Sequence, residues 1–368
     1  MGRQFPARDA FGTKLQLLIV TDIPLYRYRL VIYGNERKEK ENTDIEMKYL
    51  YPLLFIALLI CSCKLEKAST EDTADTKVVE QQFNADSAYN YIVAQCRFGA
   101  RTPGSEAHRL CGDYIVKKFT DLGMQVTEQK ANLTMWDGKT YECRNIIASY
   151  LPDASQRIII ASHWDSRPWA DADKDASKHG EAVMAANDGA SGVAVMMEIA
   201  RQIKELGIQY GIDFICFDLE DYGTPEDEEG PADGSDWCVG SAYWASHLHR
   251  ENYRADCGIL LDMVGGKGAK FRYEGFSMQN AQTVVAQIWG AAKTAGYADF
   301  FPEEQGGHIN DDHLNLIKIG IPTADIISYY DGMPSFGPTW HTTNDTPENI
   351  SKETLKAVGQ TLFQALAQ

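Results

Sequence analysis

The ends of the apolar runs in this chain carry side chains that could bind a metal ion or transfer a proton. Such runs end at His163 and Asp165, at Glu220 and Asp221, and at Asp262. A single acidic residue at a strand end is most often a cap or a solvated turn residue, but a repeated pattern that includes histidine favours a functional site. Carboxylate and imidazole ligands suit a divalent ion such as zinc, with a further carboxylate beside it as a base.

Two more segments add to this set. Asp188 lies in Asn-Asp-Gly-Ala-Ser-Gly at residues 187–192, where a helix is predicted to start, and His341 follows Trp340 in a loop after the last apolar run. Ligands of open α/β sheets bind beyond the carboxyl ends of the strands. We therefore expect these side chains to gather at one edge of a sheet.

The elements that would position them follow from the hydrophobic pattern. Strands are predicted at residues 125–133, 145–150, 157–162, 212–218, 257–264 and 321–327, and helices at 86–96, 106–122, 192–206, 281–295 and 352–367. Several strands are continuously apolar, as in a sheet covered on both faces. Buried strands alternating with amphipathic helices predict an α/β three-layer sandwich.

Composition narrows the class of protein. The 368 residues include 52 Asp and Glu against 35 Lys and Arg, for a net charge of -17. Such an acidic balance excludes nucleic acid as the expected partner, because a phosphate backbone requires a basic surface. The 8 cysteines lack the spacing of a zinc finger or of a small disulfide scaffold. An enzyme or a globular binding domain remains.

The region before the predicted domain is typical of export. Lys48, an apolar run at residues 53–60 and the Ser-Cys pair ending at Cys63 resemble a bacterial lipoprotein signal, in which that cysteine is acylated. The alternative is that the run is a buried element of the folded domain. We expect a lipid-anchored protein exported to the periplasmic or cell-envelope face of a membrane. The predicted organisation is a mis-called extension (1–46), a signal peptide (47–63), a polar tether (64–82) and one catalytic domain (83–368).

Taken together, the motifs resemble the superfamily of zinc-dependent aminopeptidases and glutaminyl cyclases. The resemblance covers residues 83–368 and rests on the turn at 101–105, on 163–166, on 187–192, on Glu220–Asp221, on Asp262 and on 341–345. It implies a central, twisted, mostly parallel sheet flanked by helices. It also implies a peptide substrate, and we expect a monomer.

The cyclase branch implies one zinc ion, held by Asp188, Asp221 and His341. Glu220 would be the general base that converts an N-terminal glutamine to pyroglutamate with release of ammonia. Asp262 would then belong to a hydrogen-bond network with Asp311.

Asp311 favours this branch. The segment Asn310-Asp311-Asp312-His313 is similar to the cyclase segment whose first aspartate is functional, although a helix N-cap with an acidic first turn is the simpler interpretation. An aromatic substrate pocket is implied at Trp340, Phe336 and Trp237. The chain departs from the cyclase pattern at Asp221, often a glutamate, and at Asp325, a histidine in many animal cyclases.

The aminopeptidase branch remains the alternative. There two zinc ions share the constellation, with Asp188 as a bridge and with His163 and Asp262 completing the second site. His163, Asp165 and Asp325 are thus candidates for a second metal site or for support of the first. A peptide-binding module without activity would predict a broken ligand set or a neutral residue at 220, and neither is present.

One acidic insert lies between Asp221 and Trp237. It contains six carboxylates and no lysine or arginine: Glu226, Asp227, Glu228, Glu229, Asp233 and Asp236. We interpret it as a solvated loop at the rim of the pocket. A calcium site is the alternative, because hard cations prefer oxygen ligands.

Overall fold

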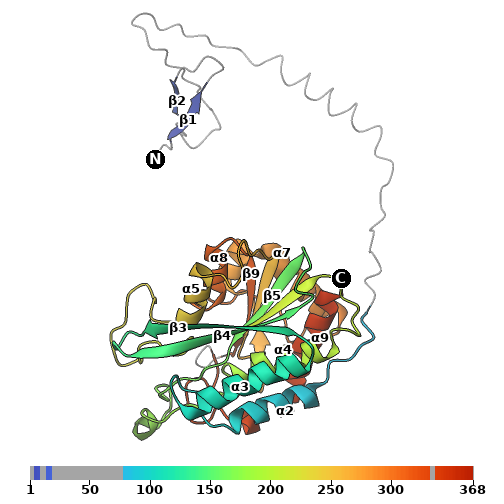
Figure 1. Cartoon of the computed structure of the whole chain (residues 1–368). Coiled ribbons are helices and arrows are strands. Elements are labelled where there is room, and N and C mark those ends of the chain that lie inside the picture. Colours follow the sequence, from blue (N-terminus) through green and yellow to red (C-terminus); the bar gives the residue numbers. More distant parts are fainter. Residues whose placement is uncertain (1–3, 9–13, 19–77, 332–335, 368) are drawn as a thin grey trace, which may run out of the picture. The chain divides into compact units, whose positions relative to one another are not determined.

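The computed structural model describes residues 4–8, 14–18, 78–331 and 336–367 (Figure 1). It has two compact units, residues 1–73 and 74–368. In the first unit, β1 (Gln4–Arg8) and β2 (Lys14–Leu18) pair in antiparallel fashion. The predicted signal peptide, Cys63 and most of the predicted tether lie outside the described residues. In the described part of the chain, no helix is both long and apolar enough to cross a membrane.

A mixed sheet of seven strands forms the centre of the second unit. Its strands are β3 (Gln125–Thr134), β4 (Thr140–Tyr150), β5 (Arg157–His163), β6 (Gly211–Phe217), β7 (Cys257–Asp262), β8 (Lys270–Phe271) and β9 (Thr323–Tyr329), in the order β3-β4-β6-β5-β7-β9-β8. The four inner strands β6, β5, β7 and β9 are parallel. The outer strands β3, β4 and β8 pair antiparallel.

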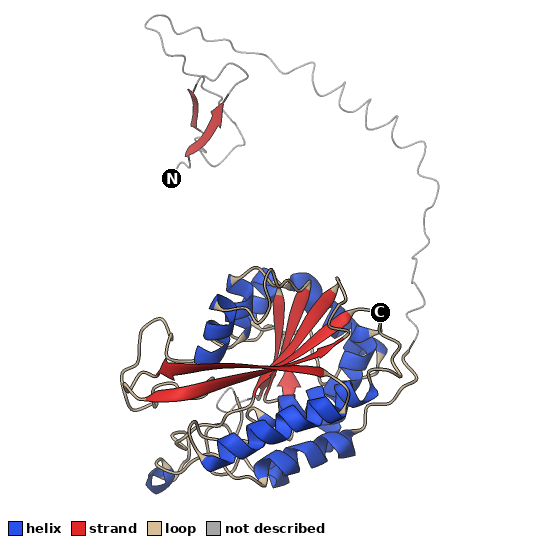
Figure 2. Cartoon of the chain, in the orientation of Figure 1, coloured by secondary structure: helices blue, strands red, loops and turns tan. Residues whose placement is uncertain are grey.

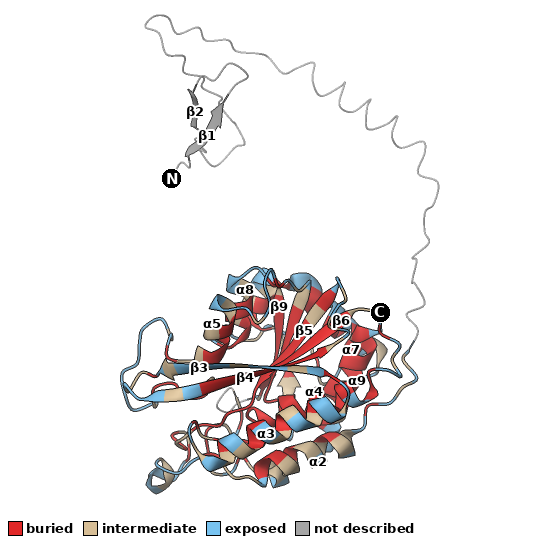
Figure 3. Cartoon of the chain, in the orientation of Figure 1, coloured by how far each residue is buried: buried red, intermediate tan, exposed pale blue. Residues whose placement is uncertain are grey.

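Helices cover both faces of this sheet (Figure 2). One face packs against α3 (Glu106–Asp121), α4 (Ala190–Gln202) and α7 (Gln282–Thr294), and α2 (Ala85–Cys96) and α9 (Lys352–Leu366) pack on these helices in the same hydrophobic core. The other face packs against α5 (Val239–Ser246) and α8 (His313–Lys318). Neighbouring strand residues face opposite layers: Ile160 contacts the first group of helices and Ile159 the second. Accordingly, β6 and β9 are buried along their whole length, and β5 and β7 are buried at all but one residue each (Figure 3).

The predicted three-layer sandwich is confirmed, and the differences lie at element boundaries and in short elements. The strand predicted at 145–150 begins earlier, at Thr140, because β3 and β4 extend as a polar hairpin whose residues alternate in exposure only weakly. The helix predicted at 192–206 ends at Gln202. The short helices α5, α6 (Gly275–Asn280) and α8 were not predicted. Helices of so few turns give almost no periodic signal.

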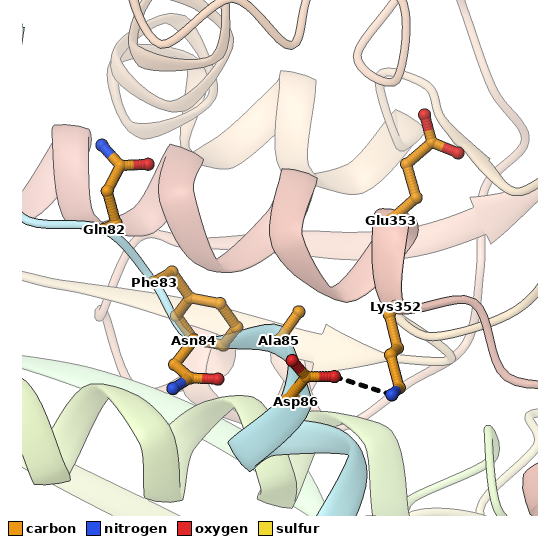
Figure 4. A pocket seen from close by; sticks show the side chains of 7 residues that line it. All are labelled: Gln82, Phe83, Asn84, Ala85, Asp86, Lys352 and Glu353. Atoms are coloured by element: carbon orange, nitrogen blue, oxygen red, sulfur yellow. Dashed lines mark hydrogen bonds and ion pairs between the residues drawn. The ribbon is translucent and has the colours of Figure 1, made fainter.

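Residues 78–82, at the end of the predicted tether, contact α9. The Gln360 side chain donates to the carbonyl of Gln81 (3.0 Å) and accepts from the N–H of Phe83 (2.9 Å). A surface hollow of about 490 Å³ lies between this segment and the start of α9, where Asp86 and Lys352 form an ion pair of 2.6 Å (Figure 4). Its lining contains none of the side chains at the strand ends, so it is not the candidate site.

A buried ion pair joins the start of β5 to β6. Arg157 Nε lies 2.6 Å from Asp213 Oδ2, and both side chains are buried. Burial opposes ionisation, yet hydrogen bonds from Arg157 and from two hydroxyl groups hold the pKa of Asp213 below its usual range. The pair therefore stabilises the fold above about pH 4, the pKa of an unfolded aspartate, and less as the pH falls through the lower folded value.

We expect Asp213→Asn to lower the free energy of unfolding by about 3–5 kcal/mol at neutral pH, because it leaves the buried Arg157 charge without its partner. Urea denaturation at pH 7 and pH 3 measures this, and the difference from wild type should shrink at pH 3. Glu106→Gln, which removes an exposed ion pair with Arg109 on α3, is the matched control and should have no measurable effect. An unchanged denaturation midpoint for Asp213→Asn would contradict the prediction.

Candidate active site

The carboxyl ends of three adjacent parallel strands bring the predicted side chains together. His163 is the last residue of β5, Asp262 is the last residue of β7, and Glu220 and Asp221 follow β6. The chain turns sharply after two of these strands, with positive φ at Leu219 (54°) and Met263 (50°). Such angles are strained for residues other than glycine and cluster at functional sites.

Asp188, Asp221 and His341 form the first group, with ligand atoms within 4.8 Å of one another. His341 Nε2 lies 3.2 Å from Asp221 Oδ1 and 3.7 Å from Asp188 Oδ2. Neither Asp221 oxygen accepts a hydrogen bond from the described residues, although Asp221 is buried. Two carboxylates that converge on an imidazole nitrogen suit a zinc ion, whose charge would satisfy these buried acceptors.

Further side chains hold these three ligands in place. The Asp345 carboxylate accepts the N–H groups of Asn187 (2.8 Å) and Asp188 (2.9 Å), which fixes the turn before α4. Asp165 accepts the N–H groups of Glu220 and Asp221, each at 3.2 Å. Asp165, predicted as a second metal ligand or a support, thus contacts the backbone of the segment after β6.

Sequence reasoning missed Asp171 and Arg167. Asp171 Oδ1 lies 3.5 Å from His341 Nδ1, the arrangement in which a carboxylate orients a metal-binding histidine. Arg167 is buried, donates to both oxygens of Asp171, and has Nη1 3.5 Å from Asp221 Oδ1. Despite the burial of Asp171, hydrogen bonds from Arg167 and His341 hold its pKa well below the usual range. The only indication of this contact in the sequence was that Arg167 and Asp171, which have opposite charges, lie four residues apart in a loop.

His163, Asp188 and Asp262 form a second group, which shares Asp188 with the first. His163 Nε2 lies 2.9 Å from Asp188 Oδ1 and 3.3 Å from Asp262 Oδ1. Burial raises the pKa of Asp262 to about 6, and the charge of Asp188 contributes. The side chains expected for the second metal of an aminopeptidase are therefore also together, and ligand geometry alone does not separate the two branches.

Glu220 and Asp311 belong to a third group, completed by Cys238. The Glu220 side chain keeps 12% of its surface exposed, so a substrate can reach it, whereas Asp311 is buried. Burial raises the pKa of Glu220 well above its usual range, and the charges of Asp221 and Asp311 raise it further. Burial also raises the pKa of Asp311 to about 7, with Asp262 as the next cause.

Asp311 and Asp312 precede α8, but neither side chain makes a capping hydrogen bond to it. Asp312 occupies the N-cap position and makes no capping hydrogen bond, and Oδ2 of Asp311 has no partner among the described residues. Asp311 instead forms a fourth group with His313 and Asp325. Glu274 lies on the far side of His313, with Oε2 3.1 Å from Nε2. The helix-cap interpretation of Asp311–Asp312 is therefore wrong for the side chains, and Asp325 contributes to the surroundings of Asp311.

Aromatic rings border the first group. Trp340 stacks on the His341 ring at 3.8 Å, and Phe336 lies 5.1 Å from Trp340. The Trp237 ring lies parallel to the His341 ring, with 6.0 Å between their centres. The Arg167 guanidinium lies 4.7 Å from the centre of the Trp237 ring. Trp340 and Trp237 thus lie beside the predicted ligand His341, and Phe336 packs against Trp340.

The acidic insert is exposed at residues 226–229, while Asp236 is buried and accepts the N–H of Thr224 (2.8 Å). Among the described residues, no insert carboxylate belongs to a group of three metal-binding side chains, so nothing favours the calcium alternative. The six cysteines of the described region are free thiols.

Comparison with known proteins identifies the family. The sequence profile of peptidase family M28 matches residues 145–366, more than half of the chain. The glutaminyl cyclase of Bacteroides thetaiotaomicron, solved with N-acetylhistamine, is 45% identical with a TM-score of 0.77, and the match covers 78% of this chain and 99% of that one. A leucine aminopeptidase precursor from B. thetaiotaomicron VPI-5482 is also 45% identical, with a TM-score of 0.76 and coverages of 79% and 99%.

Aminopeptidase YwaD of Bacillus subtilis is 27% identical over 312 residues, which span 82% of this chain but only 59% of YwaD. The resemblance inferred from the strand-end motifs is thereby confirmed. The profile match, the near-complete coverage of solved relatives and the shared ligand groups lead to one conclusion: the chain belongs to peptidase family M28.

Proposed function

We propose that this protein is a glutaminyl-peptide cyclotransferase, which converts the N-terminal glutamine of peptides to pyroglutamate and releases ammonia. The observation that carries the proposal is the convergence of Asp311 with Glu220, beside the group formed by Asp188, Asp221 and His341. A glutaminyl cyclase among the solved relatives supports it.

The buried oxygens of Asp221, which accept no hydrogen bond from the described residues, and the imidazole of His341 fit one zinc ion, with Asp188 as the third ligand. When bound there, zinc supplies a positive charge that polarises the γ-carboxamide oxygen of the substrate. Glu220 is accessible, and its pKa lies above the usual range. It takes a proton from the α-amino group as that nitrogen attacks the γ-carbon, and it later returns the proton to the departing ammonia.

Asp311 would hold the leaving amide nitrogen, and Asp262, whose charge acts on Asp311, would support it. The aromatic rings of Trp340, Phe336 and Trp237 would enclose the glutamine side chain and exclude water. Because the attack is intramolecular, the enzyme gains mainly from orientation and does not need a second metal ion to generate hydroxide.

A second candidate function is that of a metallo-aminopeptidase with two zinc ions. The group formed by His163, Asp188 and Asp262 supports it, as does the leucine aminopeptidase precursor among the solved relatives.

One assay separates the two candidates. Purified, zinc-loaded protein is given a peptide that begins with glutamine and, separately, peptides that begin with leucine and alanine. Ammonia release from the first, without free amino acids from the others, supports the cyclase. Free leucine or alanine without ammonia would show that the aminopeptidase is correct.

We also propose that the protein is exported and anchored to a membrane by a lipid on Cys63. The sequence at residues 47–63 supports this proposal. In a bacterial host that processes lipoproteins, the wild type should incorporate an alkyne-labelled fatty acid and sediment with membranes, and Cys63→Ser should do neither. Cys61→Ser is the matched control and should behave as wild type, because Cys61 follows the bulky Ile60. Equal labelling of the Cys63→Ser variant would disprove the assignment.

A further inference from the structure

We propose that the thiol of Cys238 is a positioning residue, which holds the Glu220 carboxylate in the orientation needed to accept the substrate proton. The inference rests on the proposed function, since it assigns a role within that reaction. The observation behind it is that the Cys238 thiol donates to Glu220 Oε1, with Sγ at 3.3 Å.

The backbone fixes the position of Cys238 relative to Glu220. Cys238 N–H donates to the Glu220 carbonyl (3.1 Å), and Val239 N–H donates to the Leu219 carbonyl (3.1 Å). The Cys238 carbonyl in turn accepts from Ser241 Oγ at 3.0 Å and from the Asn315 side chain at 3.3 Å. The start of α5 is thus attached to the turn after β6, which fixes the backbone that carries the thiol relative to the backbone that carries the base.

The two oxygens of Glu220 have different neighbours. Oε1 accepts from the Cys238 thiol, whereas Oε2 lies 3.8 Å from His163 Nδ1, on the side of the metal-binding residues. The thiol contact therefore leaves Oε2 as the oxygen that faces the substrate amine. It also prevents the carboxylate from rotating away about its last side-chain bond.

Charge explains why a thiol suits this position. Sγ is grouped with Glu220 and with buried Asp311, whose Oδ2 has no partner among the described residues. Burial raises the pKa of Cys238 well above the usual range, and the charge of Glu220 contributes, so the sulfur keeps its proton and donates. A thiol is a weak donor, so it orients Glu220 and reduces the basicity of the carboxylate only slightly. A lysine or arginine at this position would reduce that basicity much more.

The test compares Cys238→Ser, Cys238→Ala and Cys238→Val in the ammonia-release assay. We expect kcat to fall by roughly tenfold in the alanine and valine variants, the size of one hydrogen bond to a charged group. KM should change little, and the serine variant should recover most of kcat because its hydroxyl still donates. Cys111→Ala, at a buried thiol on α3, is the matched control and should keep the wild-type kcat.

A purely structural role gives a different result. In that case the alanine and valine variants would keep kcat, the serine variant would be no better than alanine, and only the thermal unfolding midpoint would change. The inference is overturned if the alanine and valine variants keep the wild-type kcat, or if the serine variant has no higher kcat than the alanine variant.

A spectroscopic measurement reports on the contact without turnover. The S–H stretching band of Cys238, obtained by subtracting the infrared spectrum of Cys238→Ala from that of the wild type, should shift when Glu220 is replaced by glutamine. A band that does not move would also overturn the inference.

Failure of this inference can be told from failure of the proposed function. If the wild type releases amino acids and no ammonia, the proposed function is wrong. The kcat values of the Cys238 variants can then be compared with the aminopeptidase substrates. If the wild type releases ammonia and Cys238→Ala keeps the wild-type kcat, the function stands and the role of Cys238 is wrong.

Discussion

Glu220→Gln is expected to reduce kcat for cyclisation by about 10² to 10⁴-fold, the usual contribution of general acid–base catalysis. Glutamine has nearly the same shape as glutamate but cannot accept the substrate proton. Folding and zinc content should be unchanged, because Glu220 belongs to neither of the two groups that share Asp188, which are the ones expected to hold zinc. The measurement is ammonia release from a glutamine-initiated peptide, together with zinc analysis and thermal unfolding of the same preparation.

The neighbouring Asp311 provides a companion variant. Asp311→Asn should also reduce cyclisation strongly, because an amide cannot accept the same hydrogen bonds from the leaving nitrogen. Glu220→Gln protein with wild-type ammonia release would show that another group is the base. Asp311→Asn protein with wild-type ammonia release would remove the argument that Asp311 takes part in cyclisation.

The fold could be predicted because its inner strands have an unambiguous pattern. The runs that became β5, β6, β7 and β9 are mainly apolar, and the ends of β5, β6 and β7 carry polar side chains that the structure gathers at one edge. Strand order was not readable, because hydrophobicity shows that a strand is buried but not which strand lies beside it. The structure places β6 between β4 and β5, so that Glu220 and His163 become neighbours.

Parts of the site were beyond sequence reasoning for a related reason. Asp171 and Cys238 lie in loops, and each acts through a contact with a distant residue, His341 and Glu220 respectively. Nothing in the local sequence indicates such a contact. Glu274 was also missed, although it is fully buried and accepts from the N–H groups of Phe276 and Ser277. In the structure it is the N-cap of α6, a helix that was not predicted, and only the proximity of His313 connects it to Asp311.

Loss of one metal ligand should have the largest effect on activity. Asp221→Ala is expected to lose its bound zinc and to reduce ammonia release by about 10³-fold or more. Polarisation of a carbonyl by a metal ion is worth several kcal/mol, and about 1.4 kcal/mol corresponds to a factor of ten in rate. Dialysis against a chelator should produce the same loss in the wild type, and added zinc should restore activity to the wild type but not to Asp221→Ala.

The number of zinc ions tests the choice of branch. We expect one tightly bound zinc per chain, because His163 Nε2 is hydrogen-bonded to Asp188 Oδ1 and lies 3.3 Å from Asp262 Oδ1, so that the imidazole itself contacts both carboxylates of the second group. His163→Asn, which keeps a donor near these carboxylates, should therefore retain the same zinc content as the wild type. Two tightly bound ions in the wild type, one of which is lost in His163→Asn, would contradict the cyclase assignment and establish the second metal site of an aminopeptidase.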